Sequence, residues 1–399
     1  MAHFHSPRIV TDGLVFYYDT ANALKSYKGE PTVNYVPGTY DYSLYAYVSG
    51  PVTAIATNEE RKEVAVKRYT ITNAVNTARA AIYPNTNTTD YFTFSFKWKY
   101  NGTVTASPSM GITASKGNPE GGANNNSFGY ERTNTVAIGN GWYLTTYTFR
   151  FSSNPTGRCM LTFGINTGSN TGYVGETFDV YEAQFEAKAH KTQYVNGTRS
   201  STAALLDMVG GTTIDLTNVS FDDNAQMTFD GTNDYIQASE YTIPATGPFT
   251  VEFVYRISTV GGRGGLFERN PNSPYNGMSL GQGGAGNWAF NISDTFNGTL
   301  LSAAFTYPTQ NVWYHDVGVF NGSNTVQSYR NGVLVNTTTA GTVGNIDTQG
   351  TRDKLLVMKR DNNSSTVGGD VALVKVYNRA LTAPEVAQNY QAVKSRFGI

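Results

Sequence analysis

The chain has 399 residues and a net charge of −1, and only 15% of its residues are charged, well below the roughly 25% of an average soluble protein. Glycine (41), tyrosine (27) and phenylalanine (21) are abundant, which is typical of β-sheets joined by tight turns. A near-neutral charge without a long basic run argues against a nucleic-acid partner. No stretch reaches the ~20 apolar residues of a membrane span, so membrane insertion is not expected.

Residues 1–12 form a polar lead-in before the first predicted strand. Because Pro7 fixes its backbone angle and lacks an N–H group, this segment is not expected to be helical. We predict an extended arm that anchors the protein to its own copies or to another protein. The competing interpretation is a frayed chain end. Residues 13–31 then supply one strand, Gly13 to Asp19, and a loop.

The segment 32–200 contains several clear strand patterns. Residues 92–100 alternate aromatic and polar side chains without a break, and residues 142–151 and 178–186 follow similar patterns. Cys159, the single cysteine, excludes an internal disulfide and alternates with apolar neighbours, which predicts a buried thiol. The tryptophans at strand positions are expected in the cores, namely Trp98 and Trp142 here and Trp313 further on.

The segment 201–399 continues with predicted strands at 227–236, 249–255 and 313–320. The Asn331-Gly332 pair between alternating apolar residues predicts a hairpin. Residues 261–287 are rich in glycine and asparagine and are predicted to be long loops.

The C-terminal segment pairs a strand with a helix. Residues 371–377 are apolar at nearly every position, which predicts a strand covered on both faces. Thr382 and Glu385 have the spacing of a capping box, and Gly398 lies where a helix would end. We therefore predict a short helix after the last strand.

This C-terminal sequence, including VKVYNRALTAPEV, resembles the end of concanavalin A-like, laminin-G-type lectin domains. The phrases GLVFYYD at 13–19 and MTFDGTNDYI at 227–236 resemble their opening strands, which are adjacent in that family. The intervening residues end in VYEAQFE and QYVNG, similar to carbohydrate-binding-module jelly rolls. The resemblance implies an all-β protein of two β-sandwich (jelly-roll) domains and a short C-terminal helix. A jelly roll (32–200) would be inserted after the first strand (13–31) of a lectin-like domain completed by 201–399.

The whole chain is similar to structural proteins of large tailed bacteriophages. The phrases HSPRIVTDGLVFYYDTANALKSYKGEPTVN, NGTRS and MTFDGTNDYI occur there in the same order. The resemblance implies a protein on the surface of the virion, as a capsid decoration, a head fibre or a tail-fibre knob. Its partners would be other virion proteins, copies of itself in a homo-oligomer, and cell-surface polysaccharide. A purely structural decoration protein that binds no glycan remains the alternative.

Catalysis is not expected. Glycoside hydrolases with the concanavalin-like fold place Glu-x-Asp-x-Glu on one strand, so that the carboxylates share one cleft. The nearest run here, from Glu252 to Arg256, has one carboxylate. No catalytic residue is therefore predicted, and a glycan depolymerase is the least favoured function.

Glycan binding requires exposed aromatic rings with polar side chains nearby. The predicted loop region offers such a mixture, and the inserted segment offers a second one. The predicted glycan-binding residues are Arg269, Asn270, Tyr275, Asn276 and Trp288 in the first group, and Tyr130 and Arg132 in the second. The same residue types dominate protein interfaces, so subunit contact is the alternative.

No cofactor is required by this interpretation, and calcium is the candidate cation. The lectin-like sandwiches often fix a loop with a carboxylate and backbone carbonyls, which suits a hard cation. The candidate ligands are Asp19, Asp230, Asp234 and Asp370 in the lectin-like domain and Asp179 in the insert. Alternatively, each carboxylate caps a turn of its own backbone.

Overall fold

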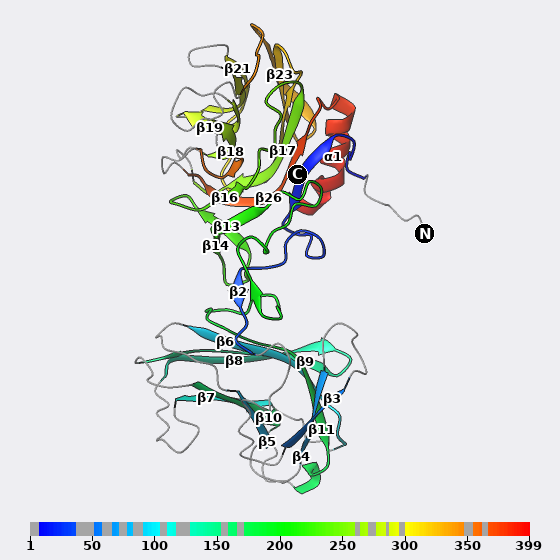
Figure 1. The fold of residues 1–399 in the computed structure, drawn as a ribbon, viewed down its shortest axis with the longest axis vertical. Helices are drawn as coiled ribbons and strands as arrows, with labels where there is room; N and C mark the ends of the chain where they lie inside the picture. Colours follow the sequence, from blue (N-terminus) through cyan, green and yellow to red (C-terminus); the bar gives the residue numbers. More distant parts are fainter. Residues whose placement is uncertain are drawn as a thin grey trace. The chain divides into compact units, whose positions relative to one another are not determined.

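The structure is a computed structural model. It describes residues 8–36, 52–57, 66–71, 78–82, 91–103, 110–116, 128–152, 159–165, 171–259, 264–269, 277–284, 287–294, 300–346, 354–360 and 366–399. The chain divides into two compact units (Figure 1). The larger unit contains Met1–Pro31, Ser200–Asp222 and Gln226–Ile399, and the smaller unit contains Thr32–Arg199 with Asp223–Ala225. Across the described ranges, no helix has the length and apolar character needed to cross a membrane.

The larger unit contains two antiparallel sheets. The first sheet has the strand order β14 (Ser220–Phe221), β15 (Met227–Asp230), β26 (Gly368–Tyr377), β17 (Phe249–Ile257), β22 (Tyr314–Phe320), β23 (Thr325–Arg330) and β24 (Val333–Thr339), and β1 (Leu14–Asp19) also pairs with β26. The second has the order β13 (Ile214–Asn218), β16 (Tyr235–Ala238), β25 (Leu356–Val357), β18 (Gly265–Arg269), β19 (Gly277–Gly284), β20 (Asn287–Ser293) and β21 (Leu300–Phe305).

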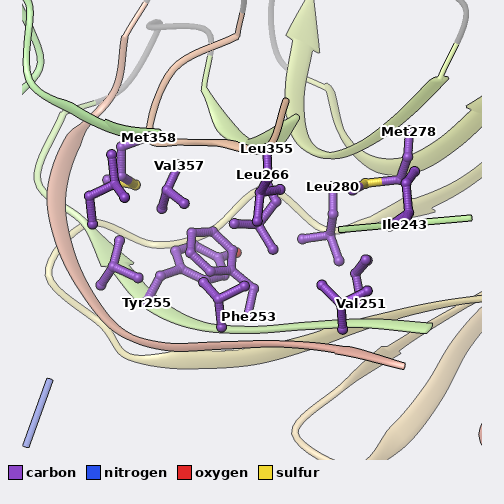
Figure 2. Packing of buried hydrophobic residues seen from close by; sticks show 14 of the residues in the cluster. Ile243, Val251, Phe253, Tyr255, Leu266, Met278, Leu280, Leu355, Val357 and Met358 are labelled. Atoms are coloured by element: carbon purple, nitrogen blue, oxygen red, sulfur yellow. The ribbon is translucent and has the colours of Figure 1, made fainter. Parts of the chain in front are cut away.

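The core of the larger unit lies between these sheets. Val251, Phe253 and Tyr255 alternate along β17 and are buried, and Figure 2 shows them opposite Leu266 of β18 and Leu280 of β19. Each fully buried side chain of this kind contributes about 1.5–3 kcal/mol relative to an exposed one. The even-numbered residues of β17 point to the opposite face because successive side chains alternate in a strand.

That opposite face is covered by helix α1 (Ala383–Phe397). Val386 and Val393 of the helix are buried against the outer face of the first sheet. The backbone N–H of Thr382 donates to Glu385 Oε2 at 2.8 Å, and Gly398 ends the helix with φ 69°. The predicted strand covered on both faces and the predicted helix are both confirmed.

Residues 8–12 lie against the chain's own helix α1. The backbone N–H of Val10 donates to Asn389 Oδ1 at 2.8 Å, and Gln388 Nε2 donates to the carbonyl of Arg8 at 2.7 Å. Val10 is buried. These contacts engage residues 8–12 within their own unit, and binding of the arm to a neighbour stays a prediction. Residues 1–7 of the predicted arm lie outside the described residues.

The prediction of loops across 261–287 is wrong for residues 265–269 and 277–284, which form β18 and β19, while residues 261–263, 270–276 and 285–286 lie outside the described residues. Gly265 and Gly281 face one another in the register of this pair, with φ +142° and +152°. A Cβ atom on Gly265 would lie 2.4 Å from the carbonyl oxygen of Leu280. The glycines permit two backbones to approach closely, so here they belong to strands rather than to a loop.

Two further turns are visible in the structure. The phrase predicted as one strand at 227–236 is divided between β15 and β16, which belong to different sheets. Gly231, with φ 80°, lies in the turn between them. The hairpin at Asn331-Gly332 is confirmed, because the two residues have positive φ angles of 50° and 77°. Positive φ at both central residues gives a two-residue turn whose twist matches that of the flanking strands.

The smaller unit also contains packed sheets. One has the order β3 (Val52–Thr57), β4 (Val66–Ile71), β11 (Thr177–Glu186), β6 (Phe92–Tyr100), β9 (Trp142–Phe151) and β8 (Phe128–Gly139). Another has the order β5 (Ala78–Ile82), β10 (Cys159–Ile165) and β7 (Met110–Lys116), and β2 (Thr32–Val33) pairs with β12 (Thr198–Arg199). Aromatic residues from the first two sheets share one core, among them Phe94, Phe96 and Phe163.

The tryptophans predicted as core residues have different environments. Trp98 and Trp142 are buried, although Trp142 lies against Tyr181 in a separate cluster. Trp313 of the larger unit is half-buried, with its ring 4.9 Å from that of Phe397. The backbone of Cys159 belongs to β10, and its side chain lies outside the described residues.

Candidate functional site

The outer face of the six-stranded sheet in the smaller unit carries the candidate site. Along β9, Tyr147, Phe149 and Phe151 point into the core and are buried. Because side chains alternate along a strand, Thr148 and Arg150 lie on the outer face. That face is available for binding wherever its side chains are exposed.

Four side chains gather on this face, and we call them the tyrosine–arginine surface: Tyr91, Tyr130, Arg132 and Arg150. Tyr130 is the direct cross-strand partner of Arg150, and Arg132 is the partner of Thr148. Direct partners in an antiparallel pair project to the same side, so Tyr130 and Arg132 share the outer face with Arg150.

Ring contacts hold this surface together. The ring centroids of Tyr91 and Tyr130 are 5.3 Å apart in an edge arrangement, and the guanidinium carbon of Arg150 lies 4.8 Å from the Tyr91 ring centroid. Tyr130 remains 36% exposed and Arg132 is exposed. The surface therefore presents an aromatic ring beside two guanidinium groups, which offers apolar contact and hydrogen-bond donors together.

The arrangement brings together Tyr130 and Arg132, which the sequence predicted, and Tyr91 and Arg150, which sequence reasoning missed. The sequence contained a pattern that indicated an outward-facing Tyr91. In the stretch where apolar and polar residues alternate, Tyr91 takes a position that polar residues occupy further along, at Thr93 and Ser95. An aromatic residue in the polar phase points away from the core. The contact of Tyr91 and Arg150 with Tyr130 depends on the strand register, which the local sequence does not encode.

Trp288 is a correction to the predicted glycan-binding residues, because it is 1% exposed. Its Nε1 donates to Asp316 Oδ2 at 3.1 Å, and its ring stacks on Tyr255 at 5.0 Å. Asp316 also accepts two hydrogen bonds of 2.7 Å from Arg330. Trp288 thus connects the second sheet to the first through its hydrogen bond to the buried Asp316, and its own ring has no exposed face.

The other predicted residues of that group stay predictions. The backbone of Arg269 ends β18, and its side chain lies outside the described residues. Asn270, Tyr275 and Asn276 also lie outside them.

Arginine partners engage three of the predicted calcium ligands. Asp19 accepts hydrogen bonds from Arg396 at 2.6 and 2.7 Å, Asp179 accepts from Arg68 at 2.7 and 2.9 Å, and Asp370 accepts from Arg256 at 2.6 Å. These guanidinium groups compete with a cation for the same oxygen atoms.

The remaining two candidates, Asp230 and Asp234, support a turn. Asp230 Oδ1 accepts from the backbone N–H of Thr232 at 2.7 Å, and Asp234 Oδ2 accepts from that of Asp230 at 2.9 Å. Within the described ranges, no three His, Cys, Asp or Glu side chains converge in a way that could hold a metal ion. The calcium site stays a prediction.

Glu252, the lone carboxylate of the hydrolase-like position, lies beneath helix α1 and not in an open cleft. It is fully buried, and its Oε1 is 2.5 Å from Lys375 Nζ and 3.0 Å from His315 Nε2. Asn389 Nδ2 of the helix donates to its Oε2 at 2.7 Å. These contacts make Glu252 a structural group of the helix–sheet interface.

Comparison with known proteins concerns the larger unit. Residues 230–387 match the model of the concanavalin A-like lectin/glucanases superfamily. The comparison with curated proteins gave no match.

Solved structures that are similar include the binding domain of botulinum neurotoxin serotype D, at 17% identity and a TM-score of 0.37, covering 48% of this chain and 49% of that one. The botulinum neurotoxin serotype G binding domain is similar at 16% identity and a TM-score of 0.37, covering 48% of this chain and 49% of that one. The binding domain of Paraclostridial mosquitocidal protein 1 is similar at 16% identity and a TM-score of 0.37, covering 47% of this chain and 49% of that one. The chain matches about half the length of each of these structures. Together, the family match and the two packed sheets identify a concanavalin A-like lectin/glucanase domain in the larger unit of this all-β chain.

Proposed function

We propose that this chain is a non-enzymatic glycan-binding protein and that its tyrosine–arginine surface contacts the glycan. The observation that carries the proposal is the exposed ring of Tyr130, held beside Tyr91 and Arg150 on an outer sheet face. An aromatic face accommodates the C–H surface of a sugar, while guanidinium groups donate to its oxygen atoms. The concanavalin A-like domain supports the same class of function, because its family contains lectins.

The environment of Glu252 supports a binding function rather than hydrolysis. A general acid or nucleophile must reach the scissile bond of its substrate. Glu252 is enclosed by Lys375, His315 and Asn389 and has no exposed surface. It therefore contributes to packing in this proposal, and no turnover of polysaccharide is expected.

The test is a glycan array probed with the full chain and with Tyr130→Ala. Loss of one central aromatic contact should weaken binding about tenfold, equivalent to about 1.4 kcal/mol. Tyr241→Ala is a matched control, because Tyr241 is also an exposed tyrosine, at 42%, but belongs to the larger unit. Equal binding by Tyr130→Ala and the unchanged chain would remove this surface from the proposal, and binding to no glycan would remove the function.

We propose further that the protein is displayed on the virion of a tailed bacteriophage, with other virion proteins and its own copies as partners. The support is the order of its sequence phrases, which resembles that of phage structural proteins across nearly the whole chain. Mass spectrometry of purified particles would test this location directly.

A second candidate function is assembly or decoration without glycan binding. It is favoured by the edge strand β24, where Val333, Leu334 and Val335 are 66%, 47% and 46% exposed. Consecutive exposed apolar residues on a sheet edge are typical of surfaces that another protein covers.

A further inference from the structure

We infer that the tyrosine–arginine surface selects glycans that carry carboxylate groups, such as polysaccharides containing uronic or sialic acids. This inference rests on the proposed function and specifies its ligand class.

The charge on the outer sheet face supports this choice. Across β6, β8 and β9, the side chains of that face include basic residues and no acidic residue. The outer-face side chains of these three strands are Thr93, Ser95, Lys97 and Lys99 of β6, Trp142, Leu144, Thr146, Thr148 and Arg150 of β9, and Tyr130, Arg132, Asn134 and Val136 of β8. The carboxylate on β8, Glu131, turns to the other face, where Tyr147 donates to it at 2.5 Å.

The two lysines of this face are already engaged. Lys97 pairs with Glu182 at 2.5 Å, and Lys99 lies over the ring of Trp142 at 5.9 Å. Arg132 and Arg150, in contrast, have no carboxylate partner among the residues that the structure describes. The unbalanced positive charge is therefore concentrated beside the exposed ring of Tyr130.

The geometry of the two arginines suits a carboxylate. A guanidinium group donates two parallel hydrogen bonds to a carboxylate, which a neutral sugar hydroxyl cannot accept in the same way. Arg150 is held over the Tyr91 ring, so little side-chain freedom is lost when it binds. Arg132 lies diagonally from Arg150 across the strand pair, at roughly 7–8 Å in this arrangement, so both can contact one ligand.

The test compares ligands that differ only in charge. The full chain is titrated with oligogalacturonate and with its methyl ester, and it is also applied to an array of neutral, uronic-acid-containing and sialylated glycans. We expect at least tenfold stronger binding of acidic glycans than of their neutral counterparts. Because exposed charges are screened by salt, this preference should shrink between about 0.05 M and about 0.5 M NaCl.

Arginine variants locate the effect. Arg132→Gln and Arg150→Gln should each reduce the preference for acidic glycans several-fold, and the double variant should abolish it. Arg150→Lys retains the charge but loses the paired donors, so it should recover only part of the preference. Lys25→Gln, an exposed charge of the larger unit, is the matched control. Thermal unfolding verifies that each variant is folded, and the exposed Arg132 provides a variant that does not alter the core.

The outcomes separate the two proposals. Binding of neutral and acidic glycans with equal affinity, with dependence on Tyr130, would overturn the inference and leave the proposed function intact. A preference for acidic glycans that both glutamine variants retain would also overturn it. No glycan binding at all would overturn both.

Discussion

At the scale of single residues, the most demanding feature is the buried polar cluster of Glu252, His315, Lys375 and Asn389. All four side chains are fully buried between the first sheet and α1. Burial by itself raises the pKa of Glu252, but the nearby Lys375 and His315 outweigh it and hold the pKa at about 2. His315 Nε2 lies 3.0 Å from Glu252 Oε1 without a hydrogen bond between them, so this contact is electrostatic.

Removing one member of this cluster should cost much of the stability of the larger unit. Lys375→Met leaves a buried carboxylate without its main cation, and such losses typically cost about 3–5 kcal/mol. Urea unfolding followed by fluorescence measures the change in the free energy of unfolding. The double variant Glu252→Leu with Lys375→Met should recover part of the loss, because it removes both buried charges. A Lys375→Met variant as stable as the unchanged chain would contradict a paired buried carboxylate.

The same cluster predicts a dependence of stability on pH. The folded-state pKa of Glu252 lies below its ordinary value, so the unfolded state binds the proton more readily. The stabilisation is therefore complete above about pH 4.5 and is lost as the pH falls toward 2. Glu385 has a pKa of about 2 because Arg379 donates to it, and it contributes in the same window. The difference in unfolding free energy between the unchanged chain and the double variant isolates the contribution of Glu252.

At the scale of elements, sheet edges differ in how they are protected. Strand β8, an edge of the smaller unit, carries Glu131 and Arg132. Strand β24, an edge of the larger unit, contains no charged residue and no proline. Charges and proline are common means of preventing edge-to-edge pairing. Their absence from β24 favours a contact that covers this edge.

We expect β24 to pair with a second copy of the chain. Light scattering after size exclusion should show an oligomer, and Leu334→Lys should convert it to a monomer because a buried lysine on the new interface is costly. Val136→Lys is the matched control: Val136 is 43% exposed on the edge strand β8. A monomeric unchanged chain, or an oligomer that Leu334→Lys leaves intact, would show that this edge is not the interface.

At the scale of the whole molecule, the chain passes out of the larger unit and back into it. Strand β1 pairs with β26, with Leu14 opposite Tyr377 and Asp19 opposite Leu373, although nearly the whole chain separates the two strands in sequence. On the larger unit the two crossing points are close, since the backbone N–H of Lys28 donates to the carbonyl of Ala204 at 2.7 Å. On the smaller unit, β2 and β12 pair at its two ends. We propose that residues 32–199 are a domain inserted into the lectin-like domain.

Fragments test this proposal. Residues 201–399 alone lack β1 and leave part of the β26 edge unpaired, so we expect a fragment that binds hydrophobic dye and unfolds without a cooperative transition. Residues 8–31 joined to 200–399 by a short glycine–serine linker should restore cooperative unfolding. Residues 32–199 should fold alone because they contain their own core. A monomeric, cooperatively folded 201–399 fragment would contradict the proposal.

Local sequence patterns determined much of this protein. The alternation at 92–100, the capping box of Thr382 and Glu385, and the Asn331-Gly332 turn each predicted the element that forms. These signals act through side-chain periodicity and backbone preference within a few residues. For that reason they can be read without knowing the partner strands.

Only the tertiary structure decided which residues meet. It placed Trp288 against Asp316 in the core, turned the glycine-rich stretch into β18 and β19, and brought Tyr91 and Arg150 beside Tyr130. Each result depends on the pairing register of strands that are distant in sequence. A shift of one residue in that register would send every side chain of a strand to the opposite face, so no local pattern specifies these contacts.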